Sequence, residues 1–174
     1  MTCEYARLEK QFPELHGFVL LDPARLDAFC ESRAEGADLL TRFTQTDDGD
    51  RICQEGIAIP MTGIDAGDYS ISIRDSLSPG PEGPPRVLSQ GWILGTETGE
   101  VVFSGLGYLA CWDPDHPRHA RIRIPAGWYG VDIRGYVLGE GGVGEEWLYD
   151  LALTRSRQKP PFTADLTASF GLLP

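Results

Sequence analysis

Hydrophobic and polar residues alternate along much of the chain, and one alternating pattern occurs twice, about sixty residues apart. Residues 57–60 read Ile-Ala-Ile-Pro, and residues 66–74 read Ala-Gly-Asp-Tyr-Ser-Ile-Ser-Ile-Arg. Residues 122–125 and 126–134 repeat this order as Ile-Arg-Ile-Pro and Ala-Gly-Trp-Tyr-Gly-Val-Asp-Ile-Arg. A period of two is typical of a strand with one buried face, and Gly indicates a turn. Each copy therefore predicts strand, turn and strand, a scaffold element without a catalytic motif.

Further strands are predicted around the two copies. Residues 18–21 are a compact apolar run that suits a buried strand. Residues 90–105 contain two apolar segments around the turn sequence Thr-Glu-Thr-Gly, which predicts a β-hairpin. Residues 106–112 and 146–154 predict two more strands. Four prolines in residues 76–85 exclude helix and ladder pairing there, so this stretch is interpreted as a long surface connection within a hairpin.

Helical signals are concentrated near the N-terminus. Asp22 followed by Pro23 combines an N-cap residue with proline at the first helical position. This predicts a helix over residues 23–44 that breaks or kinks at Gly36. A shorter helix is predicted around residues 5–11, ended by a proline.

Two polar segments predict irregular structure. Residues 46–50, Thr-Asp-Asp-Gly-Asp, predict a turn, because Asp side chains bond to neighbouring backbone and Gly accepts a positive φ. They are only superficially similar to a calcium loop, since a closing glutamate and a second helix are missing and strand-like residues 57–59 follow. Residues 162–174 predict either a terminal strand or an extended tail packed on the surface.

Together these elements predict one mainly β domain, an antiparallel β-sandwich of about 8–10 strands with an N-terminal helix as a minor α component. Within residues 1–174 we expect a strand and helix element over 1–45, a sandwich core over 52–155 and a C-terminal tail over 156–174. A length of 174 residues suffices for one well-buried core. The 21 Gly and 13 Pro suit many turns between short strands.

The formal net charge of −11 narrows the choice of partners. Nucleic acid is not expected, because affinity for its backbone comes from clustered Lys and Arg. A basic protein is favoured, although an acidic surface also serves solubility alone. No apolar run suits a signal peptide or a membrane span, so we expect a cytoplasmic protein without membrane contact. The four cysteines lack metal or redox spacing and predict free thiols, and no cofactor is expected.

Few residues suggest catalysis or metal binding. His116 and His119 lie among acids at a spacing that suits a helical turn, but Pro114 and Pro117 exclude the helix and nearby arginines repel a cation. A solvated loop is favoured, with a metal at the two histidines as the alternative. Residues 139–146 are rich in Gly but contain three glutamates and no following Lys-Ser or Lys-Thr, which indicates a loop and not a phosphate site. An enzyme is therefore not expected.

The aromatic residues are interpreted mainly as core. Tyr69 and Tyr129 occupy the same position in the two repeat copies. Their rings are predicted to pack inward while each hydroxyl bonds a neighbouring loop, as in a tyrosine corner. Core positions are also favoured for the tryptophans, which could line a sugar-binding face if they were exposed and coplanar. These are Trp92, Trp112, Trp128 and Trp147.

The tandem Ile-Pro-turn-Gly-x-Tyr strands, the intervening Gly-Trp-Ile-Leu-Gly-Thr-x-x-Gly segment and the acidic charge resemble the small β-sandwich immunity and nuclease-inhibitor proteins of bacteria, of the polymorphic-toxin and competence type. The resemblance covers residues 56–136. It implies an immunity or inhibitor protein that neutralises a cognate basic toxin or nuclease by occluding its active site with acidic side chains. The resemblance assigns no individual site residue, because inhibitory surfaces vary with the toxin.

Three acidic loops, residues 45–50, 97–100 and 140–146, are predicted to supply the contact surface. Acids on rigid loops speed the encounter with a basic enzyme and mimic phosphate charge. The alternative is a ligand- or carbohydrate-binding module that uses the tryptophans, followed by an uncharacterised enzyme. The candidate partner-binding residues are Asp47, Asp48, Asp50, Glu97, Glu100, Glu140, Glu145 and Glu146.

Overall fold

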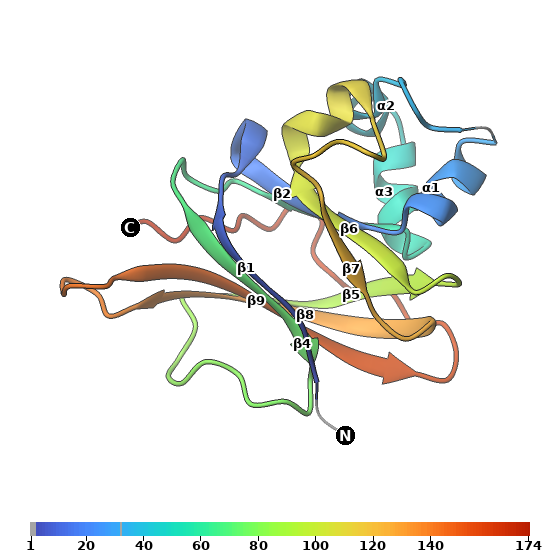
Figure 1. Cartoon of the computed structure of the whole chain (residues 1–174). Coiled ribbons are helices and arrows are strands. Elements are labelled where there is room, and N and C mark those ends of the chain that lie inside the picture. Colours follow the sequence, from blue (N-terminus) through green and yellow to red (C-terminus); the bar gives the residue numbers. More distant parts are fainter. Residues whose placement is uncertain (1–2, 32) are drawn as a thin grey trace.

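The computed structural model describes residues 3–31 and 33–174 and consists of two β-sheets packed together, with short helices beside the smaller sheet (Figure 1). The mainly β sandwich with a minor helical part is therefore confirmed. The four-stranded sheet has the order β3 (Ala58–Thr62), β2 (Gly17–Leu21), β6 (Glu100–Gly105) and β7 (Ala120–Arg123). The five-stranded sheet has the order β1 (Glu4–Gln11), β4 (Tyr69–Asp75), β9 (Glu146–Ser156), β8 (Gly127–Leu138) and β5 (Val87–Thr96).

The sequence predicted an entirely antiparallel sandwich, but the structure contains one parallel pair of strands. Strand β9 pairs with β4 in parallel, from Ser70 opposite Leu148 to Asp75 opposite Leu153. On its other side β9 pairs with β8 in antiparallel orientation. The parallel pair arises because β9 returns to the middle of the sheet and inserts between two strands that were made earlier.

The two repeat copies occupy equivalent places in the sandwich. Their first strands, β3 and β7, are the two edges of the four-stranded sheet, and their second strands, β4 and β8, flank β9. Each copy thus carries the chain from one sheet to the other. The predicted tyrosine corners are confirmed: the Tyr69 hydroxyl donates to the carbonyl of Asp65, and the Tyr129 hydroxyl donates to the carbonyl of Pro125.

Two predicted hairpins are wrong. Strands β5 and β6 lie in different sheets, so the turn after Thr96 carries the chain across the sandwich. The proline-rich connection after Asp75 joins β4 to β5, which are separated by β9 and β8, and it runs below the five-stranded sheet (Figure 1). Alternation identifies the buried face of a strand but contains no information about which strand pairs with it.

The proline-rich loop covers a buried ion pair on the outer face of the five-stranded sheet. The guanidinium of Arg74 donates from Nε and Nη2 to the two carboxylate oxygens of Asp150, at 2.8 and 2.7 Å. Its Nη1 donates to the carbonyl of Ser78 in the loop at 2.7 Å. Both charged side chains are almost completely shielded, with exposed fractions of 5% and 0%. The hydrogen bond with Asp150 raises the pKa of Arg74.

The predicted helix over residues 23–44 forms as two helices, α1 (Pro23–Phe29) and α2 (Leu39–Gln45). The carboxylate of Asp22 caps α1 as predicted, accepting from the amide of Arg25 at 2.9 Å. Gly36, with a φ of +79°, lies in the break, as predicted. Asp38 then caps α2 by accepting from the amide of Thr41 at 3.0 Å.

Three other local predictions are wrong. Residues 5–11 belong to strand β1, because Ala6 and Leu8 pair with Ile73 and Ile71 at the sheet edge. Residues 46–50 contain the start of helix α3 (Asp48–Gln54), whose first turn is stabilised by its acids. Residues 106–112 form the 3-10 helix η2 (Leu106–Cys111), with Leu106 and Leu109 on its buried side. A further 3-10 helix, η1 (Glu14–His16), precedes β2.

The C-terminal residues form an extended tail along the side of the sandwich where the edge strands β3 and β5 leave it open. The amide of Thr163 donates to Gly91 in β5, and the amide of Phe170 donates to Thr62 in β3. Phe170 and Leu172 are buried, with exposed fractions of 1% and 2%. The tail is thus part of the core and not only a surface segment. Among the described helices, none combines the length and apolarity needed to cross a membrane.

Candidate protein-binding surfaces

The three predicted acidic loops do not form one continuous surface. The turn that contains Glu97 follows Thr96, which pairs with Gly127 at the beginning of β8. The turn that contains Glu145 follows Leu138, at the end of the same strand. These two loops therefore lie at opposite ends of β8. The third group, at the start of α3, lies on the helical side of the four-stranded sheet (Figure 1).

The acids at the start of α3 differ in their availability. Asp48 accepts from Nε of Arg42 at 2.7 Å and from Nη1 of Arg51 at 3.0 Å, and these bonds hold its pKa below the usual range. Asp47 and Asp50 are exposed. Neither takes part in the ion pairs of the described residues. Asp48 therefore has a structural role, whereas Asp47 and Asp50 present negative charge to solvent.

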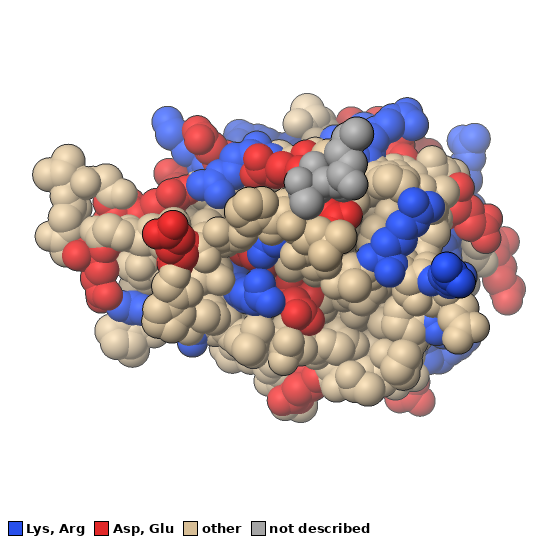
Figure 2. Space-filling model, turned by 90° about the horizontal axis from the view of Figure 1, so that it is seen from below, with Lys and Arg blue, Asp and Glu red and all other residues tan. Residues whose placement is uncertain are grey.

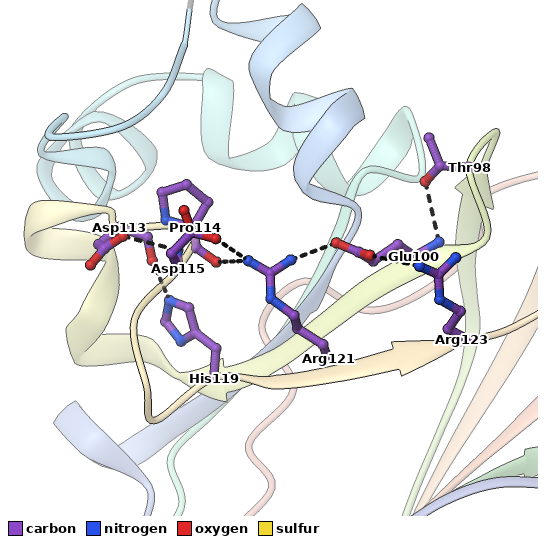
Figure 3. Close-up of polar contacts among 8 residues, drawn as sticks. All are labelled: Thr98, Glu100, Asp113, Pro114, Asp115, His119, Arg121 and Arg123. Carbon is purple, nitrogen blue, oxygen red and sulfur yellow. Dashed lines mark hydrogen bonds and ion pairs between the residues drawn. The ribbon is translucent and has the colours of Figure 1, made fainter.

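At the β5–β6 turn, Glu100 is neutralised within the protein (Figure 3). Its carboxylate binds Arg121 and, at 3.5 Å, Arg123, both on the edge strand β7. Arg121 also binds Asp115 at 2.6 Å. These cross-strand ion pairs connect β6, β7 and the loop before β7. Glu97, in contrast, is exposed and lines a cleft of about 300 Å³.

The acids of the β8–β9 turn are likewise engaged by neighbours. Glu140 pairs with Arg86, and Glu146 pairs with Arg7. Glu145 accepts from the amide of Gly141 at 2.9 Å and from the indole of Trp147 at 3.0 Å, and these bonds lower its pKa. The turn borders a groove of about 630 Å³ whose lining carries charges of both signs. Its lining includes Arg7, Glu9, Lys10, Asp68, Glu145, Glu146 and Trp147.

Charges of both signs also lie side by side on the outer face of the five-stranded sheet, between neutral residues (Figure 2). Arg134 and Asp132 form one such pair on strand β8, at 3.5 Å. Many of the carboxylates are thus neutralised by a neighbouring arginine. Among the eight predicted contact residues, the exposed carboxylates without an arginine or hydrogen-bond partner within the described chain are Asp47, Asp50 and Glu97.

The histidine cluster is organised by hydrogen bonds and ring contacts, and Figure 3 shows the hydrogen bond between His119 and the backbone of Asp113. In His119, Nε2 donates to the carbonyl of Asp113 at 2.8 Å, and Nδ1 accepts from the hydroxyl of Ser104 at 2.7 Å. Its ring stacks on the buried Trp112 at 4.9 Å between centroids, and burial lowers its pKa. Both ring nitrogens are therefore occupied. Residues 3–31 and 33–174 contain no group of three or more His, Cys, Asp or Glu that could hold a metal ion.

The tryptophans do not form the exposed coplanar face that a sugar-binding module needs. Trp92 and Trp112 are buried, with exposed fractions of 2% and 1%, as predicted for core residues. Trp128 contacts two cations, with Arg25 4.8 Å and Lys159 5.9 Å from its ring centroid. Trp147 is half-buried against Tyr69, with 5.5 Å between centroids.

Two features of the structure were not predicted from the sequence. The Arg74–Asp150 pair had a detectable signal, because Asp150 is a single acid within the apolar run of residues 147–153. The second feature is an apolar cavity beside α2 and α3. No local sequence pattern predicts it, because its walls come from segments that are far apart in the chain.

The overall architecture matches solved structures of other proteins. The crystal structure of ComJ, inhibitor of the DNA degrading activity of NucA, from Bacillus subtilis has a TM-score of 0.52 and 12% sequence identity, over 90% of this chain and 99% of that chain. The fold is similar to that of a nuclease inhibitor. The structure titled crocagin biosynthetic gene J has a TM-score of 0.50 and 13% identity, over 87% of this chain and 97% of that chain. No family model matches the sequence, and neither does any curated protein.

Proposed function

We propose that this chain is an acidic inhibitor or immunity protein, and not an enzyme, that binds a basic nuclease or toxin and occludes its active site. The observation that carries the proposal is the similarity of the fold to that of ComJ, which extends over 90% of this chain. The resemblance noted in the sequence covers only residues 56–136. The similarity of fold and the sequence resemblance both support the same class of protein, a nuclease or toxin inhibitor.

Charge supports a basic protein partner. At a net charge of −11, the chain attracts a basic enzyme over long distances and repels nucleic acid. Acidic side chains also occupy sites that nucleic-acid phosphates would take on a nuclease. We assign the first encounter to Asp47, Asp50 and Glu97, because these acids are not already neutralised within the described chain. Glu140, Glu145 and Glu146, at the far end of β8, are already engaged by Arg86, Arg7 and hydrogen bonds, and we assign them no part in the first encounter.

The test uses the purified chain and the product of the gene adjacent to its own, with plasmid DNA as substrate. We expect that product to degrade DNA, and we expect an equimolar amount of this chain to abolish the degradation. A neighbouring product that is a metabolic enzyme and forms no complex with this chain in size-exclusion chromatography would refute the proposal.

Separate neutralisation of the acids at the start of α3 and of those at the β8–β9 turn identifies the contact surface. The paired change of Asp47 and Asp50 to Asn is compared with the paired change of Glu145 and Glu146 to Gln. We expect the first pair to weaken inhibition and the second to leave it unchanged. The reverse result would place the interface at the β8–β9 turn.

A further inference from the structure

An apolar cavity of about 190 Å³ lies between the four-stranded sheet and the helices that pack beside it. Its buried walls include Val19 and Leu21 of β2, Ile52 of α3 and Leu106 of η2. The exposed residues of its lining are Thr44, Asp50, Thr62 and Leu166, so the cavity opens to solvent on this side.

The size of the cavity distinguishes it from an ordinary packing defect. Protein interiors are close-packed and contain few voids larger than a water molecule. A dry apolar cavity of about 150 Å³ accommodates benzene. Here the adjoining helix α2 also presents two apolar side chains, Leu40 and Phe43, that lie one turn apart and are only half-buried. The pocket therefore has both the volume and the apolar walls to receive a side chain.

The rim of the cavity is negatively charged. Asp50 is part of its lining, and Asp47 lies one helical turn before it. Both are exposed, whereas Asp48 between them is bound by Arg42 and Arg51. An apolar pocket beside free carboxylates is complementary to an apolar side chain that is flanked by Lys or Arg.

We propose that this cavity is the anchor pocket of the inhibitor. A Leu, Met or Phe side chain on a basic loop of the nuclease enters it, and a neighbouring Lys or Arg pairs with Asp47 or Asp50. Buried anchors of this kind contribute most of the binding energy of a protein interface, while the surrounding polar contacts exclude water. This inference rests on the proposed function and specifies where the partner binds.

Filling the pocket tests the inference. Ala58 of β3 lies in the wall with an exposed fraction of 1%, so Ala58→Leu places three additional carbons in the cavity. We expect the melting temperature to be kept or raised, while the apparent Kd for the nuclease encoded by the adjacent gene rises about tenfold or more. Thr44→Trp covers the opening without altering the interior and is expected to have the same effect. Ala126→Leu, at an exposed turn, is the matched control.

A probe that does not involve the nuclease examines the pocket itself. Benzene binds the folded state alone and should raise the melting temperature of the wild type but not of Ala58→Leu. If Ala58→Leu and Thr44→Trp inhibit the nuclease as well as the wild type does, the cavity is not the anchor pocket, and the proposed function stands. If the wild type itself does not inhibit the nuclease, the proposed function fails and the anchor pocket fails with it. The absence of any benzene shift in the wild type would show that the cavity accepts no apolar group.

Discussion

The most constrained charged residue on the outer face of the five-stranded sheet is Asp150, which is fully buried in the central strand β9. Its two oxygens are taken by Arg74, and the proline-rich loop closes over the pair through the carbonyl of Ser78. A buried ion pair is expensive to desolvate, but a single buried charge is far more expensive. The pair therefore fixes the register between β4 and β9 and the position of the loop.

Replacing one partner of this pair should cost much more than replacing both. Asp150→Asn leaves the charge of Arg74 buried without its counterion and should lower the free energy of unfolding by about 3–5 kcal/mol. The double variant Arg74→Met with Asp150→Leu should recover most of that loss. Urea unfolding of the three proteins measures both effects. A single variant with wild-type stability would contradict the structural role of the pair.

His119 should make stability depend on pH. Burial holds its pKa below the ordinary value of 6.5, so the folded protein favours the neutral ring. At pH values between the lowered pKa of His119 in the folded protein and its ordinary pKa in the unfolded chain, the unfolded chain binds more protons. Stability therefore rises with pH in this range. The contribution is present above pH 6.5 and is lost as the pH falls toward the lower folded value. The free energy of unfolding should fall more between pH 7.5 and pH 5 in the wild type than in His119→Gln, with His16→Gln, a change outside this ring cluster, as the control.

At the scale of elements, the sequence predicted strands better than their partners. The alternation predicts strands over residues 69–73 and 128–138, which β4 and β8 confirm, and Asp22 correctly identifies a helix start. The apolar run of residues 106–112 was read as a strand because a short run does not distinguish strand from helix. Pairing failed at the turn after Thr96, because a chain that changes sheets has the same local pattern as a hairpin.

For the candidate site, too, the sequence did not show which distant segments come together. The sequence identified acidic positions, but it did not show that Glu97 and Glu145 would lie at opposite ends of β8. It also did not show which acids would be neutralised, because Arg7 and Glu146 meet only through the pairing of strands far apart in the chain. Both properties depend on tertiary contacts.

The C-terminal tail should be necessary for stability. A chain that ends at Ala164 loses the buried side chains of Phe170 and Leu172, each worth about 1.5–3 kcal/mol. The two losses together are about 3–6 kcal/mol. Because typical domains are stable by only about 5–15 kcal/mol, the melting temperature should fall strongly. A chain that ends at Leu172 loses only Leu173, which is 47% exposed, and Pro174, and should melt like the wild type. Equal melting temperatures for the two truncated chains would contradict this role.

At the scale of the whole molecule, the charge of −11 should govern the rate of association. Salt shortens the range of electrostatic attraction from about 10 Å at 0.1 M to about 3 Å at 1 M. We therefore expect the association rate with the basic partner to fall about tenfold or more over this range, with little change in dissociation. Stopped-flow measurements test this. The paired Asn variant of Asp47 and Asp50 should show a weaker salt dependence, and an unchanged slope would exclude these acids from the encounter.

The central position of β9 determines when the molecule can be completed during synthesis. All four strands of the smaller sheet have been translated once Arg123 is made. Strands β4 and β8, however, have no direct neighbour in common until residues 146–156 are translated and insert between them. Pairing of strands so distant in sequence is slow. The four-stranded sheet can therefore assemble first on the nascent chain, and the five-stranded sheet closes only after residues 146–156 have been made.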